Sequence, residues 1–123
     1  MLPTGMSAAK LQSARIEAPI LQTLVAISGS AVTPVVGVSL SGFNLSCAAY
    51  TYLEQYEVPS GGDWSITRHA AVFVQGAENV SLTGLKFDQL DGNGVFLSNH
   101  VKNSTVSDND FCKCWSCSCR CSP

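Results

Sequence analysis

The sequence predicts an all-β fold in which the chain winds as a single-stranded parallel β-helix of about three or four coils. Two observations support this prediction. Short β-branched runs recur at a nearly constant distance with Gly, Asn and Asp between them, and apolar residues alternate within each run. Alternation turns one face inward and leaves Ser and Thr outside. A unit of this kind buries its apolar face only by stacking on the next unit.

The clearest copies lie in the second half of the chain. The run around Val72 recurs around Val95 at an offset of 23, and the run ending at Phe87 recurs as the run ending at Phe111 at an offset of 24. Residues one repeat apart should become neighbours on adjacent strands, about 4.8 Å apart. We therefore expect Leu82 to lie beside its repeat equivalent, Val106.

Earlier copies extend the pattern toward the N-terminus. Residues 38–45 match residues 80–87 at an offset of 42, so this coil carries an insertion. Val25 and Ile27 form a further partial match to the run around Val72. The repeats predict one fold over residues 6–111.

The insertion predicts a long loop over residues 46–69 at one edge of the helix. It holds all three tyrosines, and Pro59 and Gly61 exclude a continuous helix or a central strand. Loops of this length are functional or disordered, and the aromatic content argues against disorder. The loop is therefore a candidate functional segment.

Composition excludes several classes of function. The chain has 123 residues, a net charge of −2, and only 13% charged residues, so no basic surface is available for nucleic acid. The sequence contains no run of about 18 apolar residues that would predict a membrane span, and its N-terminus lacks the pattern of a signal peptide. Motifs for phosphate loops, nucleophile elbows and calcium loops are missing, so we expect no cofactor and no metal. The cellular location stays undetermined.

Cysteines are concentrated at the C-terminus, because Cys47 stands alone whereas five others fall within the tail, residues 112–123. Three interpretations remain open: a thiolate cluster for Zn²⁺ or Cu(I), a disulfide knot, or an end unrelated to the coils. The tail continues neither the apolar alternation nor the turn chemistry, which favours the last interpretation.

Three asparagines begin Asn-x-Ser/Thr acceptor sequences for N-glycosylation: Asn44, Asn79 and Asn103. The simpler interpretation is that a repeat rich in turn Asn and outward Ser produces such triplets by itself. The triplets would matter if a longer parent protein were exported.

The offset of 23 also predicts which polar side chains share an edge, because it places Arg68 beside Asp91 and His69 beside Gly92. An aromatic side chain beside carboxylates and an arginine suits a sugar, whose C–H groups stack on the ring. Glycoside cleavage needs two carboxyl groups about 5 to 9.5 Å apart. We expect Asp63 and Asp91 as acid and base, with these substrate-binding residues: Trp64, Arg68, His69, Asp88, Asn93 and Tyr52.

Each of these residues also has a structural interpretation. Arg68 and Asp91 can form a surface ion pair, and His69 can cap a turn. The segment 91–94 is first of all a turn, since Gly and Asn accept positive φ. The tyrosines and Trp64 can pack the loop onto the strands.

The chain resembles right-handed parallel β-helix proteins of the pectin-lyase-like superfamily, which are related to polysaccharide-acting glycoside hydrolases. The resemblance covers residues 6–111, and its most specific part is Pro-Ser-Gly-Gly-Asp-Trp at residues 59–64. It implies a right-handed helix, a carbohydrate-active scaffold and a chain that is a piece of a larger protein. The catalytic patterns of pectate lyases and polygalacturonases have no counterpart here, so no catalytic residue is transferred.

We therefore expect a fragment of a carbohydrate-active protein, hydrolase-like, with polysaccharide or glycan as its partner. A non-catalytic glycan-binding or adhesion β-helix is the alternative. A third interpretation is a truncated product with no activity of its own, whose open ends expose strand edges.

Overall fold

The structure is a computed structural model that describes residues 18–50 and 68–112. Every regular element in these two ranges is a β-strand. Since the described residues contain no helix, none of them forms a helix long and apolar enough to cross a membrane. The strands are β1 (Val25–Ser28), β2 (Val35–Val36), β3 (Ser39–Ser41), β4 (Asn44–Ser46), β5 (Ala70–Glu78), β6 (Ser81–Thr83), β7 (Lys86–Asp88), β8 (Asn93–Lys102), β9 (Thr105–Ser107) and β10 (Asp110–Cys112).

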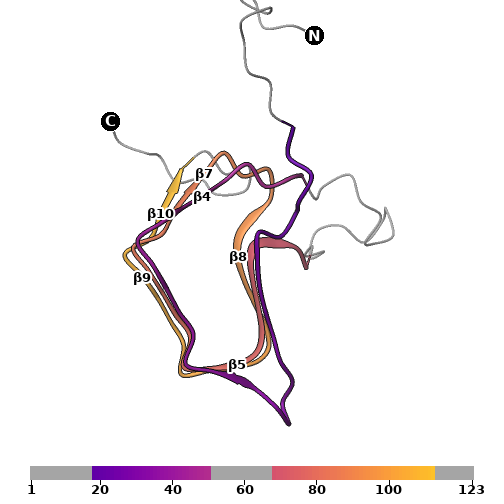
Figure 1. Ribbon diagram of the computed structural model, residues 1–123, viewed down its shortest axis with the longest axis vertical. Coiled ribbons are helices and arrows are strands. Elements are labelled where there is room, and N and C mark those ends of the chain that lie inside the picture. Colours follow the sequence, from indigo (N-terminus) through magenta and orange to yellow (C-terminus); the bar gives the residue numbers. More distant parts are fainter. Residues whose placement is uncertain (1–17, 51–67, 113–123) are drawn as a thin grey trace, which may run out of the picture.

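The strands form three parallel sheets. The first contains β1, β5 and β8, with β2 paired to the far end of β5; the second is β3–β6–β9, and the third is β4–β7–β10. The chain thus follows the same course three times, and each pass adds a strand to each sheet. Figure 1 shows the three passes lying over one another around a common ring.

The pairing register confirms the predicted offsets. Val72 pairs with Val95 at the offset of 23, and it pairs with Val25 on its other side. Leu82 pairs with Val106, and Phe87 pairs with Phe111, both at the offset of 24. The longer offset of 42 is also found, because it separates the paired residues of β3 and β6 and those of β4 and β7.

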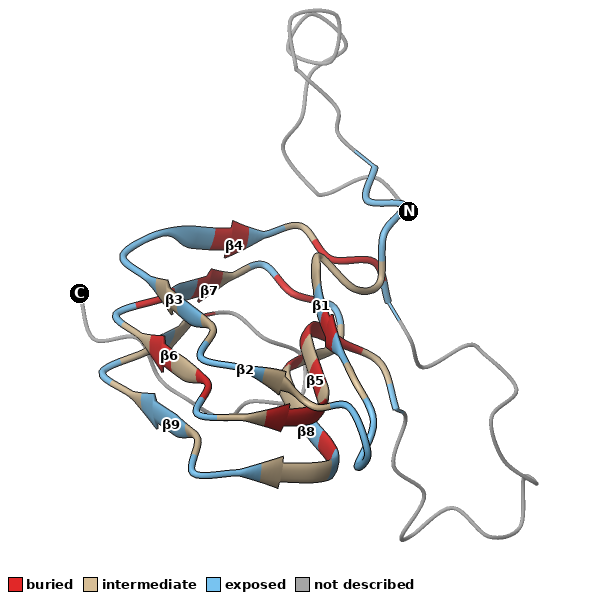
Figure 2. Cartoon of the chain, turned by 60° about the horizontal axis from the view of Figure 1, so that its bottom comes forward, coloured by how far each residue is buried: buried red, intermediate tan, exposed pale blue. Residues whose placement is uncertain are grey.

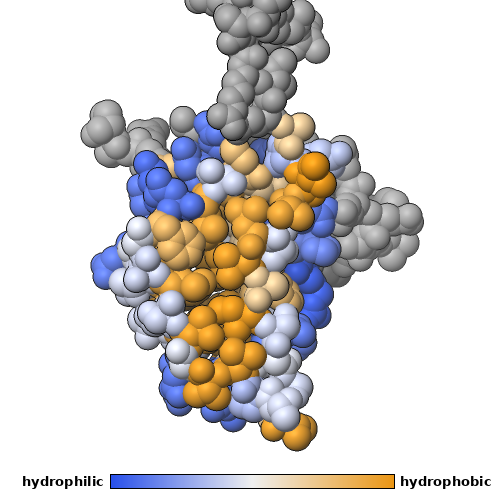
Figure 3. Space-filling view, viewed as in Figure 1, coloured by the Kyte–Doolittle hydropathy of each residue, from blue (hydrophilic) through white to orange (hydrophobic). Residues whose placement is uncertain are grey.

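Inward-facing side chains form columns that run from pass to pass. Val72, Val74, Leu82 and Phe87 of the middle pass are completely buried, and Figure 2 shows buried residues on β5 and β6 but none on β9. Phe87 stacks on Phe111 with ring centroids 4.5 Å apart. Apolar side chains fill the middle of the ring and hydrophilic ones its rim (Figure 3). Burying a large apolar side chain contributes about 1.5–3 kcal/mol, so these columns hold the passes together.

The last described pass is less well covered than the middle one. Leu97 is 46% exposed although its register partner Val74 is fully buried, and Val106 is 42% exposed beside the buried Leu82. The same inward position therefore changes from core to surface at the end of the described stack.

Corners between strands are built from residues with positive φ, and these residues also stack at the repeat offsets. Short polar side chains and glycine accept this left-handed backbone at the lowest energetic cost. This requirement explains the repeated Gly and Asn between the apolar runs. The three stacks are Gly37, Asn79 and Asn103; Gly42, Gly84 and Asp108; and Cys47 with Gln89.

One corner needs glycine for space as well as for φ. Gly76 has φ of 55°, and a Cβ added there would collide with the carbonyl group of Gly29 in the preceding pass. In the following pass the single position of Gly76 is matched by two residues, Asn99 and His100, because the register shifts between Gln75 and Ala77. This β-bulge changes the repeat offset from 23 to 24.

We predict that Gly76→Ala lowers the free energy of unfolding by about 3 kcal/mol or more, because the left-handed penalty and a backbone clash add. Gly84→Ala is the matched control. Gly84 also has positive φ, but an added Cβ would lie 3.9 Å from its nearest neighbour, so about 1 kcal/mol is expected. Urea unfolding of the full chain measures both, and equal losses would contradict the close approach of Gly29 and Gly76.

Candidate functional site

Five of the eight predicted site residues lie in the described ranges, and three do not. The described residues are Arg68, His69, Asp88, Asp91 and Asn93; those outside are Tyr52, Asp63 and Trp64. The proposed carboxylate pair of Asp63 and Asp91 therefore stays a prediction.

His69 and Asn93 lie together where β5 and β8 begin. Ala70 pairs with Asn93, and the Asn93 side-chain amide donates a hydrogen bond of 3.1 Å to the carbonyl oxygen of His69. Asn93 is already part of β8, so the predicted turn over residues 91–94 is confined to a bend at Asp91 and Gly92. Gly94 is buried against the Phe111 ring, which lies 2.7 Å from the place where a Cβ would be. Glycine is required at this position because a side chain would collide with Phe111, and not because the backbone needs a turn conformation.

Arg68 does not form the predicted ion pair with Asp91. Its guanidinium Nη2 instead donates a hydrogen bond of 2.6 Å to the hydroxyl of Ser98, a side chain in the middle of β8. Arg68 lies two residues before Ala70, where the pairing of β5 with β8 begins, and its side chain reaches Ser98 on the neighbouring strand. Ser98 is only 8% exposed, and the arginine satisfies this buried hydroxyl.

Neither of the two described aspartates of the predicted edge belongs to the paired starts of β5 and β8. Asp88 belongs to β7 and pairs with Ser46 and Cys112 in the third sheet. Asp91 is exposed in the connection to β8, separated from Asp88 by the fully buried Leu90. The edge that the sequence suggested is therefore divided between two sheets.

An aromatic pair that the sequence analysis did not single out lies on the outer side of β5 and β8. Phe73 alternates with the buried Val72 and Val74, so its ring points away from the interior. It pairs with Phe96, and the two rings are stacked with centroids 6.0 Å apart and planes 4° apart. Both rings are partly exposed. The offset of 23 that aligns Val72 with Val95 also aligns Phe73 with Phe96.

One face of the Phe73 ring points toward β1, because Phe96 occupies the other face. The register partner of Phe73 in β1 is Ala26, which is exposed and carries only a methyl group. The neighbouring column, two residues along each strand, is polar and consists of Ser28, Gln75 and Ser98. We call the surface made by these two columns and Arg68 the outer face.

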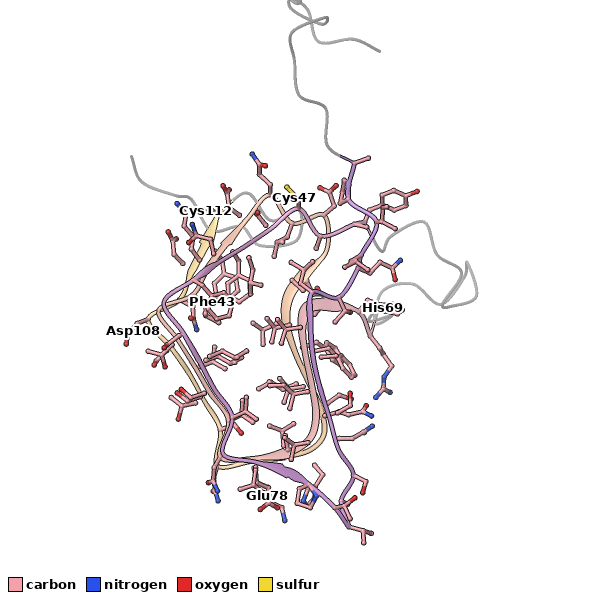
Figure 4. The ribbon with its side chains drawn as sticks, viewed as in Figure 1. Phe43, Cys47, His69, Glu78, Asp108 and Cys112 are labelled. Atoms are coloured by element: carbon pink, nitrogen blue, oxygen red, sulfur yellow. The ribbon has the colours of Figure 1, made fainter. Side chains whose placement is uncertain are left out.

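At the far end of β5, Glu78 and His100 form a second polar pair. The His100 Nε2 lies 3.0 Å from the Glu78 carboxylate, and the side chains are 22% and 29% exposed, respectively. The bulge makes them neighbours, because it adds a residue to β8 between the partners of Gln75 and Ala77. Figure 4 shows His69 and Glu78 at opposite ends of β5. A repeat aligned at one constant offset does not reveal the extra residue of the bulge, so sequence reasoning missed this pair.

The outer face joins an aromatic surface to neutral and cationic hydrogen-bond donors. A carbohydrate presents the complementary groups, since its C–H surfaces stack on rings and its hydroxyls bind amides and guanidinium groups. Over residues 18–50 and 68–112, no group of three or more His, Cys, Asp or Glu side chains is placed to hold a metal ion.

We predict that Phe73 and Phe96 contribute to stability as a pair. In a double-mutant cycle with alanine, their coupling free energy should be about 0.5–1.5 kcal/mol. Phe43, which lies between β3 and β4 (Figure 4), supplies the control, and its cycle with Phe73 should be additive within about 0.5 kcal/mol. A coupling of zero between Phe73 and Phe96 in urea unfolding would show that the rings do not stack in solution.

Comparisons with known proteins assign no family to the chain. No family model, no curated protein and no solved structure matches it.

Proposed function

We propose that this chain is part of a right-handed parallel β-helix that binds polysaccharide on its outer face. The observation that carries the proposal is the stacked, outward pair of Phe73 and Phe96 in adjacent passes. Both rings are partly exposed, so their apolar surface is available for stacking with the C–H groups of a sugar.

Because Ala26 is much smaller than its register partner Phe73, the surface beside the Phe73 ring has room for a sugar ring. A pyranose ring lying on the face of Phe73 that points toward β1 rests above the methyl group of Ala26. Its hydroxyls then reach Ser28 and Gln75, which lie about 7 Å along the strands, two residues away. Arg68 extends the donor set, because one guanidinium nitrogen binds Ser98 and the other N–H groups have no partner among residues 18–50 and 68–112.

The parallel β-helix supports this function in a simple way. Successive passes repeat the same outward position at a fixed spacing, as a polysaccharide repeats its sugar units. The right hand of the helix follows from the resemblance described above and from the preference of parallel crossovers for that hand.

Polysaccharide hydrolysis is the second candidate, with Asp63 and Asp91 as acid and base. The exposure of Asp91, two residues before Asn93, favours it. Binding ranks first because it requires no carboxylate, and because only Arg68 of its residues belongs to the predicted loop over residues 46–69.

We predict that Phe73→Ala weakens binding of the full chain to its polysaccharide at least tenfold, which corresponds to about 1.4 kcal/mol. Affinity electrophoresis against a panel of plant and algal polysaccharides identifies the ligand and then ranks the variants. Phe43→Ala is the matched control, because Phe43 is also a partly exposed phenylalanine, at 38%, but lies outside the first sheet. If both substitutions reduce binding equally, or if neither reduces it, the outer face is not the binding site.

Asp91→Asn separates binding from hydrolysis. If Asp91 is an acid or base, the variant should lose about 10²- to 10⁴-fold in hydrolysis of the bound polysaccharide while binding is retained. Released reducing ends measure this on the same panel. No hydrolysis by the unsubstituted chain, together with normal binding, would remove the hydrolase candidate and leave the binding module.

A further inference from the structure

Three acceptor triplets for N-glycosylation have different surroundings in the structure. Asn44 lies within β4, whereas Asn79 and Asn103 occupy the same corner in successive passes, with φ of 55° and 49°. All three asparagines are exposed. Turn positions at the surface are where bulky modifications are tolerated, which favours the corner over the strand.

The side chain of Asn103 has no role in the fold of the described residues. The structure contains asparagines that do have one: Asn109 accepts a hydrogen bond from the Leu85 N–H and donates one to the Leu82 carbonyl. Asn103 makes no side-chain hydrogen bond within residues 18–50 and 68–112, and its corner conformation depends on its backbone. A sugar on this amide therefore displaces no side-chain hydrogen bond of the described residues.

The hydroxyl that completes the triplet is also accessible in Asn103-Ser104-Thr105. Thr105 is exposed, and within the described part of the chain its hydroxyl has no hydrogen-bond partner. In the triplet of Asn79, by contrast, Val80 is 2% exposed and the Ser81 hydroxyl lies 3.1 Å from that of Thr83. Of the two corner asparagines, Asn103 is the better acceptor.

We propose that Asn103 is an N-glycosylation site of this protein. The Asn103 side-chain nitrogen attacks the anomeric carbon of an oligosaccharide carried on a lipid pyrophosphate. The bond from that carbon to the pyrophosphate oxygen breaks, the lipid pyrophosphate leaves with the electron pair, and the amide loses one proton to a base of the transferase. Asn103 lies in the corner after β8, whereas Phe96 lies within β8, so the glycan is attached outside the outer face.

Translation of the full chain with microsomes tests this site. A signal peptide directs the chain into the lumen, and a reporter acceptor triplet appended to the C-terminus marks the molecules that reached the transferase. Among molecules with a reporter glycan, we expect a second glycan, removable by peptide N-glycosidase, in the unsubstituted chain. It should disappear in Asn103→Gln and in Thr105→Ala and remain in Thr105→Ser, which keeps the acceptor triplet.

A reporter-marked chain without sugar on Asn103 by peptide mass spectrometry would overturn the proposal, as would an additional glycan carried by Asn44 or Asn79 alone. Thermal unfolding of the glycosylated and the enzymatically deglycosylated chain supplies the structural check. The two midpoints should agree within about 2 °C if the corner amide has no role in the fold, and a large difference would contradict that independence.

Discussion

In-register parallel pairing between successive passes is the constraint on which the rest of the structure depends. Because each middle strand pairs with one strand above and one below, a residue is placed beside its repeat equivalents. The pairing itself satisfies the backbone groups, and the inward columns that it aligns, such as Leu45, Phe87 and Phe111, supply the burial. Neither contribution survives a register slip, which would turn the inward side chains outward.

The same constraint determines the corners and the surface. A left-handed residue in one pass must lie over a left-handed residue in the next, so Gly and Asn recur at matched positions such as Gly37, Asn79 and Asn103. Outward side chains are aligned for the same reason, and this alignment stacks Phe73 on Phe96. The binding surface that we propose is therefore a product of the stacking that folds the chain.

Sequence reasoning recovered the parts of the fold that depend on the repeat. The repeat offsets predicted the strand partners, because apolar alternation and turn residues encode register directly. The site was recovered only in part. Arg68 lies before the paired strand, so the offset did not predict its partner Ser98, and the bulge at Gly76 hid the approach of His100 to Glu78. The offset of 23 also aligns Phe73 with Phe96, but the sequence pattern was used to find buried residues, and these two side chains point outward.

The most direct test of the account is measurement of cross-strand nuclear Overhauser effects in the isotope-labelled full chain. Parallel pairing at the repeat offsets predicts contacts between the backbone protons of β6 and β9, centred on Leu82 and Val106, and between those of β5 and β8, centred on Val72 and Val95. Contacts displaced by even one residue, or arranged in an antiparallel pattern, would contradict it. Either result would separate Phe73 from Phe96 and remove the outer face.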